Sequence, residues 1–133
     1  MQQITLLKAQ RVHIIGIGGI GVSAVAKLLF HEGRQVSGSD LVGGEIAEEC
    51  KALGILVMTG HRAENIPPEC DLVIYSDAVP EENSERRAAV ERGIPEMSYA
   101  EALGELSRRQ RTIAVSGTNG KSTVVDLITR ILE

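Results

Sequence analysis

Short apolar, β-branched runs alternate with longer segments of helical period along the 133-residue chain. The runs predict strands at 11–17, 35–39, 55–59, 71–76 and 112–117, with a weaker one at 93–97. Helices are expected between and after them, near 19–32, 45–53, 83–92, 99–109 and 121–132. Strands that alternate with helices in this way indicate βαβ units and an α/β fold with a mainly parallel sheet flanked by helices.

The polar pattern also suggests how two helices face their surroundings. In the first helix, a stripe at spacings of three or four residues is expected to face the sheet: Ile20, Ala24, Leu28 and His31. The helix at 83–92 reads NSERRAAVER, and we expect its charges to form a solvated outer face. His13, inside the first strand, is expected to be structural, as is His31 at the helix end.

The amino-acid composition indicates a folded domain and argues against nucleic-acid binding. Hydrophobic residues make up 43% of the chain and charged residues 24%, as in an ordinary folded domain. Aromatic residues make up only 2%, so single-stranded nucleic acid would find little to stack on, and a net charge of −4 gives no general attraction for a polyanion. We therefore expect no nucleic-acid partner.

No apolar run approaches the roughly 20 residues that cross a bilayer, and the first residues lack the basic-then-apolar pattern of a signal peptide. The sequence thus predicts a cytoplasmic protein without a membrane partner. Cys50 and Cys70 have no metal-binding spacing, and two reduced thiols are expected.

A glycine-rich stretch follows the first predicted strand. Gly16, Gly18 and Gly21 satisfy the pattern G-x-G-x-x-G between a strand and a helix, where backbone N–H groups and a helix N-terminus hold a pyrophosphate. Asp40 ends the next strand, where an acid accepts hydrogen bonds from a ribose. The sequence therefore predicts a Rossmann-like domain. The motif alone leaves open whether its ligand is NAD or a UDP-sugar, since both offer a pyrophosphate and a ribose.

A second phosphate loop is expected in SGTNGKST, at 116–123, between a strand and a helix. It departs from the strict Walker pattern because Val115 stands at the position of the first glycine. Lys121 would still reach the β and γ oxygens of ATP or GTP, and Ser122 would offer its hydroxyl to Mg²⁺. Lys121 and Ser122 are therefore the candidate catalytic residues, and the predicted ATP-binding residues are Gly117, Thr118, Asn119, Gly120, Lys121, Ser122 and Thr123.

With both loops in place, the sequence resembles the Mur ligases, ATP-dependent amide-forming enzymes of peptidoglycan precursor synthesis. The resemblance runs in order through HIIGIGGIGVSAVAKLLFHEGRQVSGSD (13–40), GHRAENI (60–66), VIYSDAVPEEN (73–83), GIPEMSYAEALGEL (93–106) and GTNGKST (117–123). It implies a Rossmann-like UDP-sugar-binding domain over 1–108. Over 109–133 it implies the first strand, P-loop and helix of a truncated ATP-binding domain.

The resemblance also implies roles for individual residues. The UDP diphosphate would be held by Gly18, Gly19, Ile20 and Gly21. The uridine ribose would meet Ser39 and Asp40, and the nucleotide and sugar side would be lined by His61, Ser76, Asp77 and Ala78. From the residues alone, His61 can also be a solvated loop histidine, and Asp77 can belong to a turn after the strand.

Within the family, GIGGIG and SGSD favour the member that adds L-alanine to UDP-N-acetylmuramate, whereas Asn119 and Ser122 are more typical of members that add later residues. The implied reaction passes the γ-phosphoryl group of ATP to the lactyl carboxylate of UDP-N-acetylmuramate. The amino group of L-alanine then attacks the acyl phosphate. The family's amino-acid domain would lie beyond these residues, so we expect the 133-residue chain to bind the UDP-sugar without turnover.

Other interpretations stay open. The chain can belong to a Mur ligase that adds a later amino acid or recycles a tripeptide, or to a folylpolyglutamate-type ligase, which would share the second loop but need no UDP-sugar domain. A non-enzymatic NAD-sensing module would share the first loop and the acid but have no use for the second loop. The apolar positions of the helix at 121–132 also predict self-association through that helix.

Overall fold

The computed structural model describes residues 6–109. Three predicted segments lie outside the described residues: the strand at 112–117, the second phosphate loop at 117–123 and the helix at 121–132. The self-association expected of that helix therefore stays a prediction. The structure therefore concerns the first of the two predicted domains.

Five parallel strands form one sheet in the order β3-β2-β1-β4-β5. The strands are β1 (Arg11–Ile15), β2 (Gln35–Asp40), β3 (Leu56–Thr59), β4 (Leu72–Tyr75) and β5 (Glu96–Ser98). The segments between and after them form α1 (Ile20–His31), α2 (Glu45–Leu53), the 3₁₀ turn η1 (Ala63–Asn65), α3 (Ser84–Glu91) and α4 (Tyr99–Arg109). The chain builds outward from β1 to β3 and then returns to the other side of β1, so the strand order reverses between β1 and β4.

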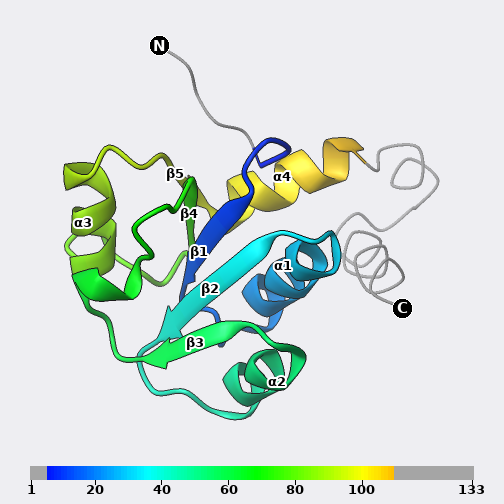
Figure 1. The fold of residues 1–133 in the computed structure, drawn as a ribbon, viewed down its shortest axis with the longest axis horizontal. Coiled ribbons are helices and arrows are strands. Elements are labelled where there is room, and N and C mark those ends of the chain that lie inside the picture. Colours follow the sequence, from blue (N-terminus) through cyan, green and yellow to red (C-terminus); the bar gives the residue numbers. More distant parts are fainter. Residues whose placement is uncertain (1–5, 110–133) are drawn as a thin grey trace.

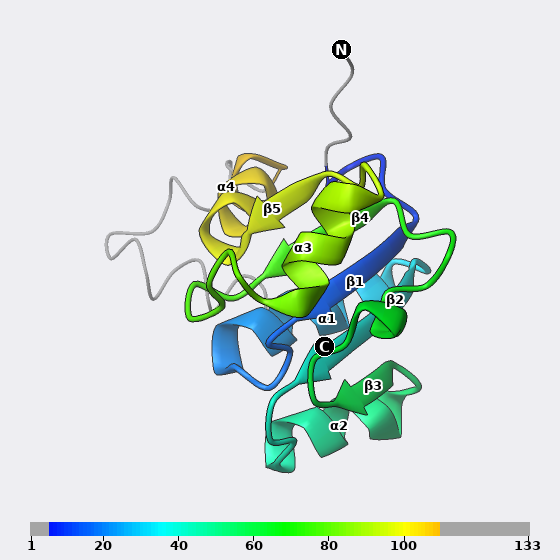
Figure 2. The same ribbon diagram turned by 90° about the vertical axis from the view of Figure 1, so that its left-hand side faces the viewer.

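Helices cover both faces of the sheet (Figure 1). One face packs against α1, α2 and α4, and Figure 2 shows α3 lying in front of the opposite face. The central strand serves both layers: Val12 and Ile14 belong to the larger core cluster, and Ile15 packs with Val73 and Ala89 beneath α3. Burial on both faces explains why the strands appear in the sequence as nearly continuous apolar runs.

The elements predicted within residues 6–109 are confirmed, with shifted boundaries. The first strand ends at Ile15 rather than residue 17, because the N–H groups of Gly16 and Ile17 both turn to the carbonyl of Ser39. The last strand begins at Glu96 rather than residue 93, because residues 93 and 94 still bond back to α3: the Ile94 N–H donates to the carbonyl of Ala89 at 2.9 Å.

The predicted stripe on α1 is wrong at both ends, because Ile20 is 80% exposed and His31 is also exposed. The helix contacts α2 and α4 as well as β2, and this buries a broader face than one stripe: Val22, Ser23, Val25, Ala26, Leu28 and Leu29. Ile20 escapes burial as the first residue of the helix, beside the glycine loop.

The prediction of a solvated charged face on α3 is wrong for two residues, Glu85 and Arg86. Glu85 is 0% exposed, and its carboxylate points towards β1 and β2 rather than into water. Arg86 is half-buried over the ring of Tyr75 and bonds to Glu96 at 2.8 Å. The rest of the helix follows the prediction, with exposed side chains such as Arg87 and Glu91.

Candidate functional site

A pocket of about 420 Å³ opens at the carboxyl ends of β1, β2 and β4. Ligands of open parallel sheets bind at this edge, where the strand order reverses. The pocket is lined by Gly16, Gly18, Gly19, Asp40, Leu41, His61, Ser76, Ala78, Val79, Pro80 and Asn83.

The floor of the pocket is the loop between β1 and α1. Gly16 has a φ of +86°, which glycine adopts without strain, and a Cβ there would lie 2.8 Å from the Cβ of Ser76. Gly19 is the N-cap residue of α1, so no capping side chain occupies the N–H groups of the first turn. Those groups and the helix dipole form a site that favours an anion.

Asp40 closes the loop from the end of β2. Its Oδ2 accepts a hydrogen bond from the N–H of Gly18 at 2.8 Å, and its Oδ1 accepts one from the N–H of Val42 at 3.3 Å. A Cβ on Gly18 would lie 2.6 Å from the same Oδ2, so this close approach requires glycine. The carboxylate thus shapes the loop and also faces the pocket, where it can accept further hydrogen bonds from hydroxyl groups.

Six of the ten residues predicted to bind the UDP-sugar line this pocket: Gly18, Gly19, Asp40, His61, Ser76 and Ala78. The other four do not. Ile20 and Asp77 are exposed but are not among the lining residues, and Gly21 packs so tightly on Tyr99 that a Cβ would overlap the tyrosine hydroxyl. Ser39 is fully buried beneath the pocket.

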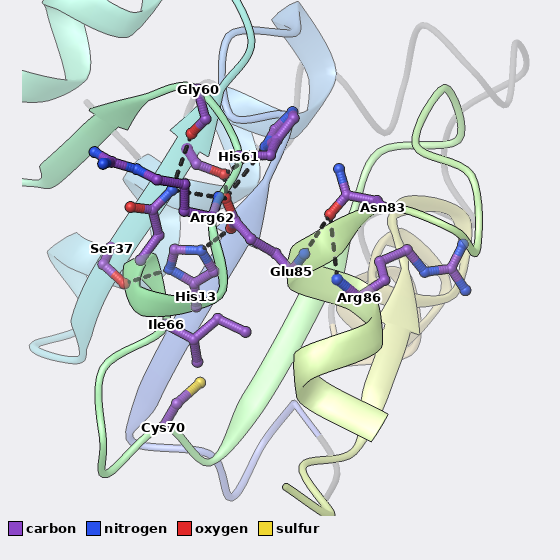
Figure 3. Close-up of polar contacts among 12 residues, drawn as sticks. His13, Ser37, Gly60, His61, Arg62, Ile66, Cys70, Asn83, Glu85 and Arg86 are labelled. Atoms are coloured by element: carbon purple, nitrogen blue, oxygen red, sulfur yellow. Dashed lines mark hydrogen bonds and ion pairs between the residues drawn. The ribbon is translucent and has the colours of Figure 1, made fainter. Parts of the chain in front are cut away.

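Beneath the pocket lies a buried polar network that sequence reasoning missed, centred on Glu85 (Figure 3). Its Oε1 accepts hydrogen bonds from His13 Nε2 at 2.6 Å and from Ser39 Oγ at 2.8 Å. Its Oε2 lies 3.2 Å from His61 Nδ1 and accepts hydrogen bonds from the N–H of Arg62 at 3.1 Å and from Asn65 Nδ2 at 2.8 Å. Five donors therefore surround one buried carboxylate, and they come from β1, β2, η1 and the loop before it.

These donors keep Glu85 ionised. Burial by itself raises the pKa of the carboxyl group, but hydrogen bonds from His13, Asn65 and Ser39, together with the charge of His13, outweigh it and lower the pKa to about 2. Glu85 therefore acts only as a hydrogen-bond acceptor at neutral pH.

One signal in the sequence points to this network. His13 interrupts one buried strand, and Ser37 and Ser39 interrupt the next at positions two apart, which share one face of the sheet. The structure pairs His13 with Ser37 in register, and His13 Nδ1 lies 2.7 Å from Ser37 Oγ. Nothing in the local pattern of the helix at 83–92 shows that Glu85 is the partner of that polar face.

The residues predicted to hold ATP and Mg²⁺, among them Lys121 and Ser122, lie outside the described residues. Across residues 6–109, no three or more His, Cys, Asp or Glu side chains gather in a way that could hold a metal ion. No helix of that part of the chain is long and apolar enough to cross a membrane.

Comparison with known proteins agrees with the fold. The model of the Mur ligase family, catalytic domain, matches residues 11–111. The chain belongs to the Mur ligase family. This membership argues against the NAD-sensing interpretation.

Two relatives within the Mur ligase family extend the comparison. The UDP-N-acetylmuramate--L-alanine ligase of Chlorobaculum tepidum is 47% identical over 133 residues, which are 99% of this chain and 28% of that protein. The enzyme of the same name from Desulfatibacillum aliphaticivorans is 42% identical over 94% of this chain and 27% of its own length. The chain thus spans little more than a quarter of the length of these ligases.

Solved structures of Mur ligases show the same architecture. The UDP-N-acetylmuramate-alanine ligase MurC from Thermotoga maritima superposes with a TM-score of 0.71 and 34% identity, covering 74% of this chain and 23% of that one. A murein peptide ligase from Psychrobacter arcticus gives a TM-score of 0.66 at 24% identity, over 72% of this chain and 20% of that one, and shares the fold.

Proposed function

We propose that this chain is the UDP-sugar-binding part of an ATP-dependent ligase that joins L-alanine to UDP-N-acetylmuramate in peptidoglycan precursor synthesis. The observation that carries the proposal is the pocket at the reversal of strand order, where the glycine loop, the start of α1 and Asp40 converge. The identity of 47% to a ligase with this printed activity supports the choice of substrates.

The pocket residues suit the two ends of a UDP-sugar. The open N–H groups at the start of α1 would receive the diphosphate, because no side chain caps them and the N-cap residue Gly19 lines the pocket. Asp40 would accept hydrogen bonds from the ribose hydroxyls, and His61, Ser76 and Ala78 would line the remainder of the nucleotide and sugar. Ser39 would act from beneath the pocket, through its contacts with His61 and Glu85.

The reaction proposed for the ligase has two stages. The lactyl carboxylate of UDP-N-acetylmuramate takes the γ-phosphoryl group of ATP, and the amino group of L-alanine displaces phosphate from the resulting acyl phosphate to form the amide. This chain's share in the reaction is to hold the acceptor in place, since transfer requires the two substrates in contact. ATP and Mg²⁺ binding by residues 117–123, with Lys121 and Ser122 in the roles given above, stays a prediction, as does a cytoplasmic location.

Thermal shift of the 133-residue chain tests the proposal, because a ligand that binds only the folded state raises its stability. UDP-N-acetylmuramate, UDP, NAD and ATP with Mg²⁺ are compared in parallel. We expect both UDP ligands to raise the melting temperature, and the exchange Lys121→Ala to leave that rise unchanged. Stabilisation by NAD without stabilisation by UDP would overturn the proposal.

A further inference from the structure

The hydrogen bonds around His61 determine which of its ring nitrogens carries a proton. Nδ1 lies 3.2 Å from Glu85 Oε2 and 3.1 Å from Ser39 Oγ. The ionised Glu85 only accepts hydrogen bonds, and the single hydroxyl proton of Ser39 is already donated to Glu85. Both neighbours of Nδ1 therefore accept, so Nδ1 must be the nitrogen that is protonated.

The second nitrogen of the ring is available to the pocket. The His61 side chain is 16% exposed and lines the pocket, while Glu85 beneath it is fully buried. No hydrogen bond within residues 6–109 engages Nε2 of His61, since the recorded contacts of the ring all use Nδ1. The network holds one edge of the ring and leaves the other edge for a ligand.

The Nε2 atom of His61 matters because the pocket has few groups that can carry a positive charge. The lining residues include neither lysine nor arginine, and Asp40 adds a negative charge. His61 is thus the one lining side chain in the described part of the chain that can become positive. A carboxylate held against Nδ1–H stabilises an imidazolium, and an imidazolium donates from Nε2 to an anion.

We propose that Glu85 is a positioning residue that holds His61 with Nδ1 protonated, so that the ring takes up a second proton on Nε2 and donates a hydrogen bond from Nε2–H to the diphosphate of the bound nucleotide. This inference rests on the proposed function, because it names a nucleotide diphosphate as the occupant of the same pocket. It differs from that proposal in assigning a role to a buried residue that cannot touch the ligand.

The charged and titratable groups around His61 come from several elements. Glu85 faces it from α3, and Asp40 lies across the pocket at the end of β2. His13 on β1 bonds to the other oxygen of Glu85, so it competes for the same negative charge. Arg62, the next residue, donates its backbone N–H to Glu85 and has an exposed side chain.

Nitrogen-15 NMR of the unmodified chain gives the first test, and only three histidines have to be assigned. In the free protein we expect a proton on Nδ1 of His61 and on Nε2 of His13, the nitrogens through which the two rings contact the shared carboxylate. Addition of UDP-N-acetylmuramate should protonate Nε2 of His61. An unprotonated Nδ1 on His61 in the free protein, or an Nε2 that stays unprotonated in the complex, would overturn the inference. This test needs no substituted variant.

A double-mutant cycle gives the second test, with the affinity for UDP-N-acetylmuramate as the readout. Glu85→Gln should weaken binding about tenfold in the wild-type background and have no further effect in a His61→Ala background, because Glu85 acts through His61. His31→Gln, on the exposed end of α1, is the matched control and should bind like the wild type. Equal losses in both backgrounds would show a merely structural role for Glu85.

The pH profile separates this inference from the proposed function. The diphosphate of UDP-N-acetylmuramate is esterified at both ends, so each phosphate keeps a constant single negative charge and a change in affinity between about pH 5 and pH 8 reports protein groups. Wild-type affinity should fall as the pH rises through this range, and the affinity of His61→Ala should not. Tight binding with a flat wild-type profile would refute the inference alone, whereas a wild type that binds no UDP ligand would refute the proposed function with it.

Discussion

Replacing Glu85 by glutamine should remove a contribution to stability that depends on pH. The pKa of this carboxyl group is lowered from 4.5 to about 2 in the folded chain. Because the folded value is the lower one, the contribution is fully present above pH 4.5 and is lost as the pH falls towards 2. At 1.36 kcal/mol per pKa unit it amounts to about 3 kcal/mol at pH 7, of which about 1 kcal/mol is left at pH 3.

Urea denaturation at pH 7 and pH 3 measures this contribution. The difference in free energy of unfolding between the wild type and Glu85→Gln should shrink by about 2 kcal/mol at the lower pH. Other carboxyl groups cancel in this difference, because both proteins contain them. Glu91→Gln, an exposed exchange at the end of the same helix, is the control and should change stability by no more than about 0.5 kcal/mol at either pH.

A difference between wild type and Glu85→Gln that stays constant from pH 7 to pH 3 would refute the reasoning. It would mean that His13, Ser39 and Asn65 do not hold the carboxylate in its ionised form, whatever their distances in the structure.

Three further exchanges test the fold and the pocket. Asn83→Ala removes the side-chain oxygen that caps two N–H groups of α3 and should cost about 1 kcal/mol in urea denaturation, while Asn83→Asp keeps the cap; equal losses would contradict the assignment. Gly38→Ala places a Cβ 2.8 Å from a carbonyl oxygen of β1 and should cost about 1–3 kcal/mol, whereas Gly104→Ala, with open space in α4, should not destabilise. Gly18→Ala pushes against the Asp40 carboxylate and should weaken UDP binding at least about tenfold by calorimetry; unchanged affinity would show that the loop tolerates a side chain.

The sheet and the glycine loop could be predicted because their signals are local. Apolar runs separated by helical periods indicate the strands and α-helices within residues 6–109, though not the 3₁₀ turn η1, and strand, glycines and helix follow one another within one short segment. The position of Asp40 beside Gly18 also follows, since neighbouring parallel strands end at the same edge.

The role of Glu85 could not be predicted in this way, because its partners are distant in the sequence. His13 lies 72 positions away and Ser39 lies 46 positions away. Within its own helix Glu85 stands among charged neighbours and is indistinguishable from them by composition. The exposure of Ile20 was missed for a related reason: periodicity gives a helix one apolar stripe, but tertiary contacts decide how wide the buried face is.

The pairing of β1 with β2 has a consequence for how the chain finds its correct fold. His13 lies opposite Ser37, and a slip of one residue would turn one set of side chains to the other face of the sheet. Apolar neighbours tolerate such an exchange, since both faces are hydrophobic. Glu85 does not, because a buried carboxylate without its donors costs several kcal/mol. A misaligned sheet would therefore leave the buried Glu85 carboxylate without its hydrogen-bond donors. The polar network around Glu85 thus disfavours misfolded alternatives that the hydrophobic core alone would accept.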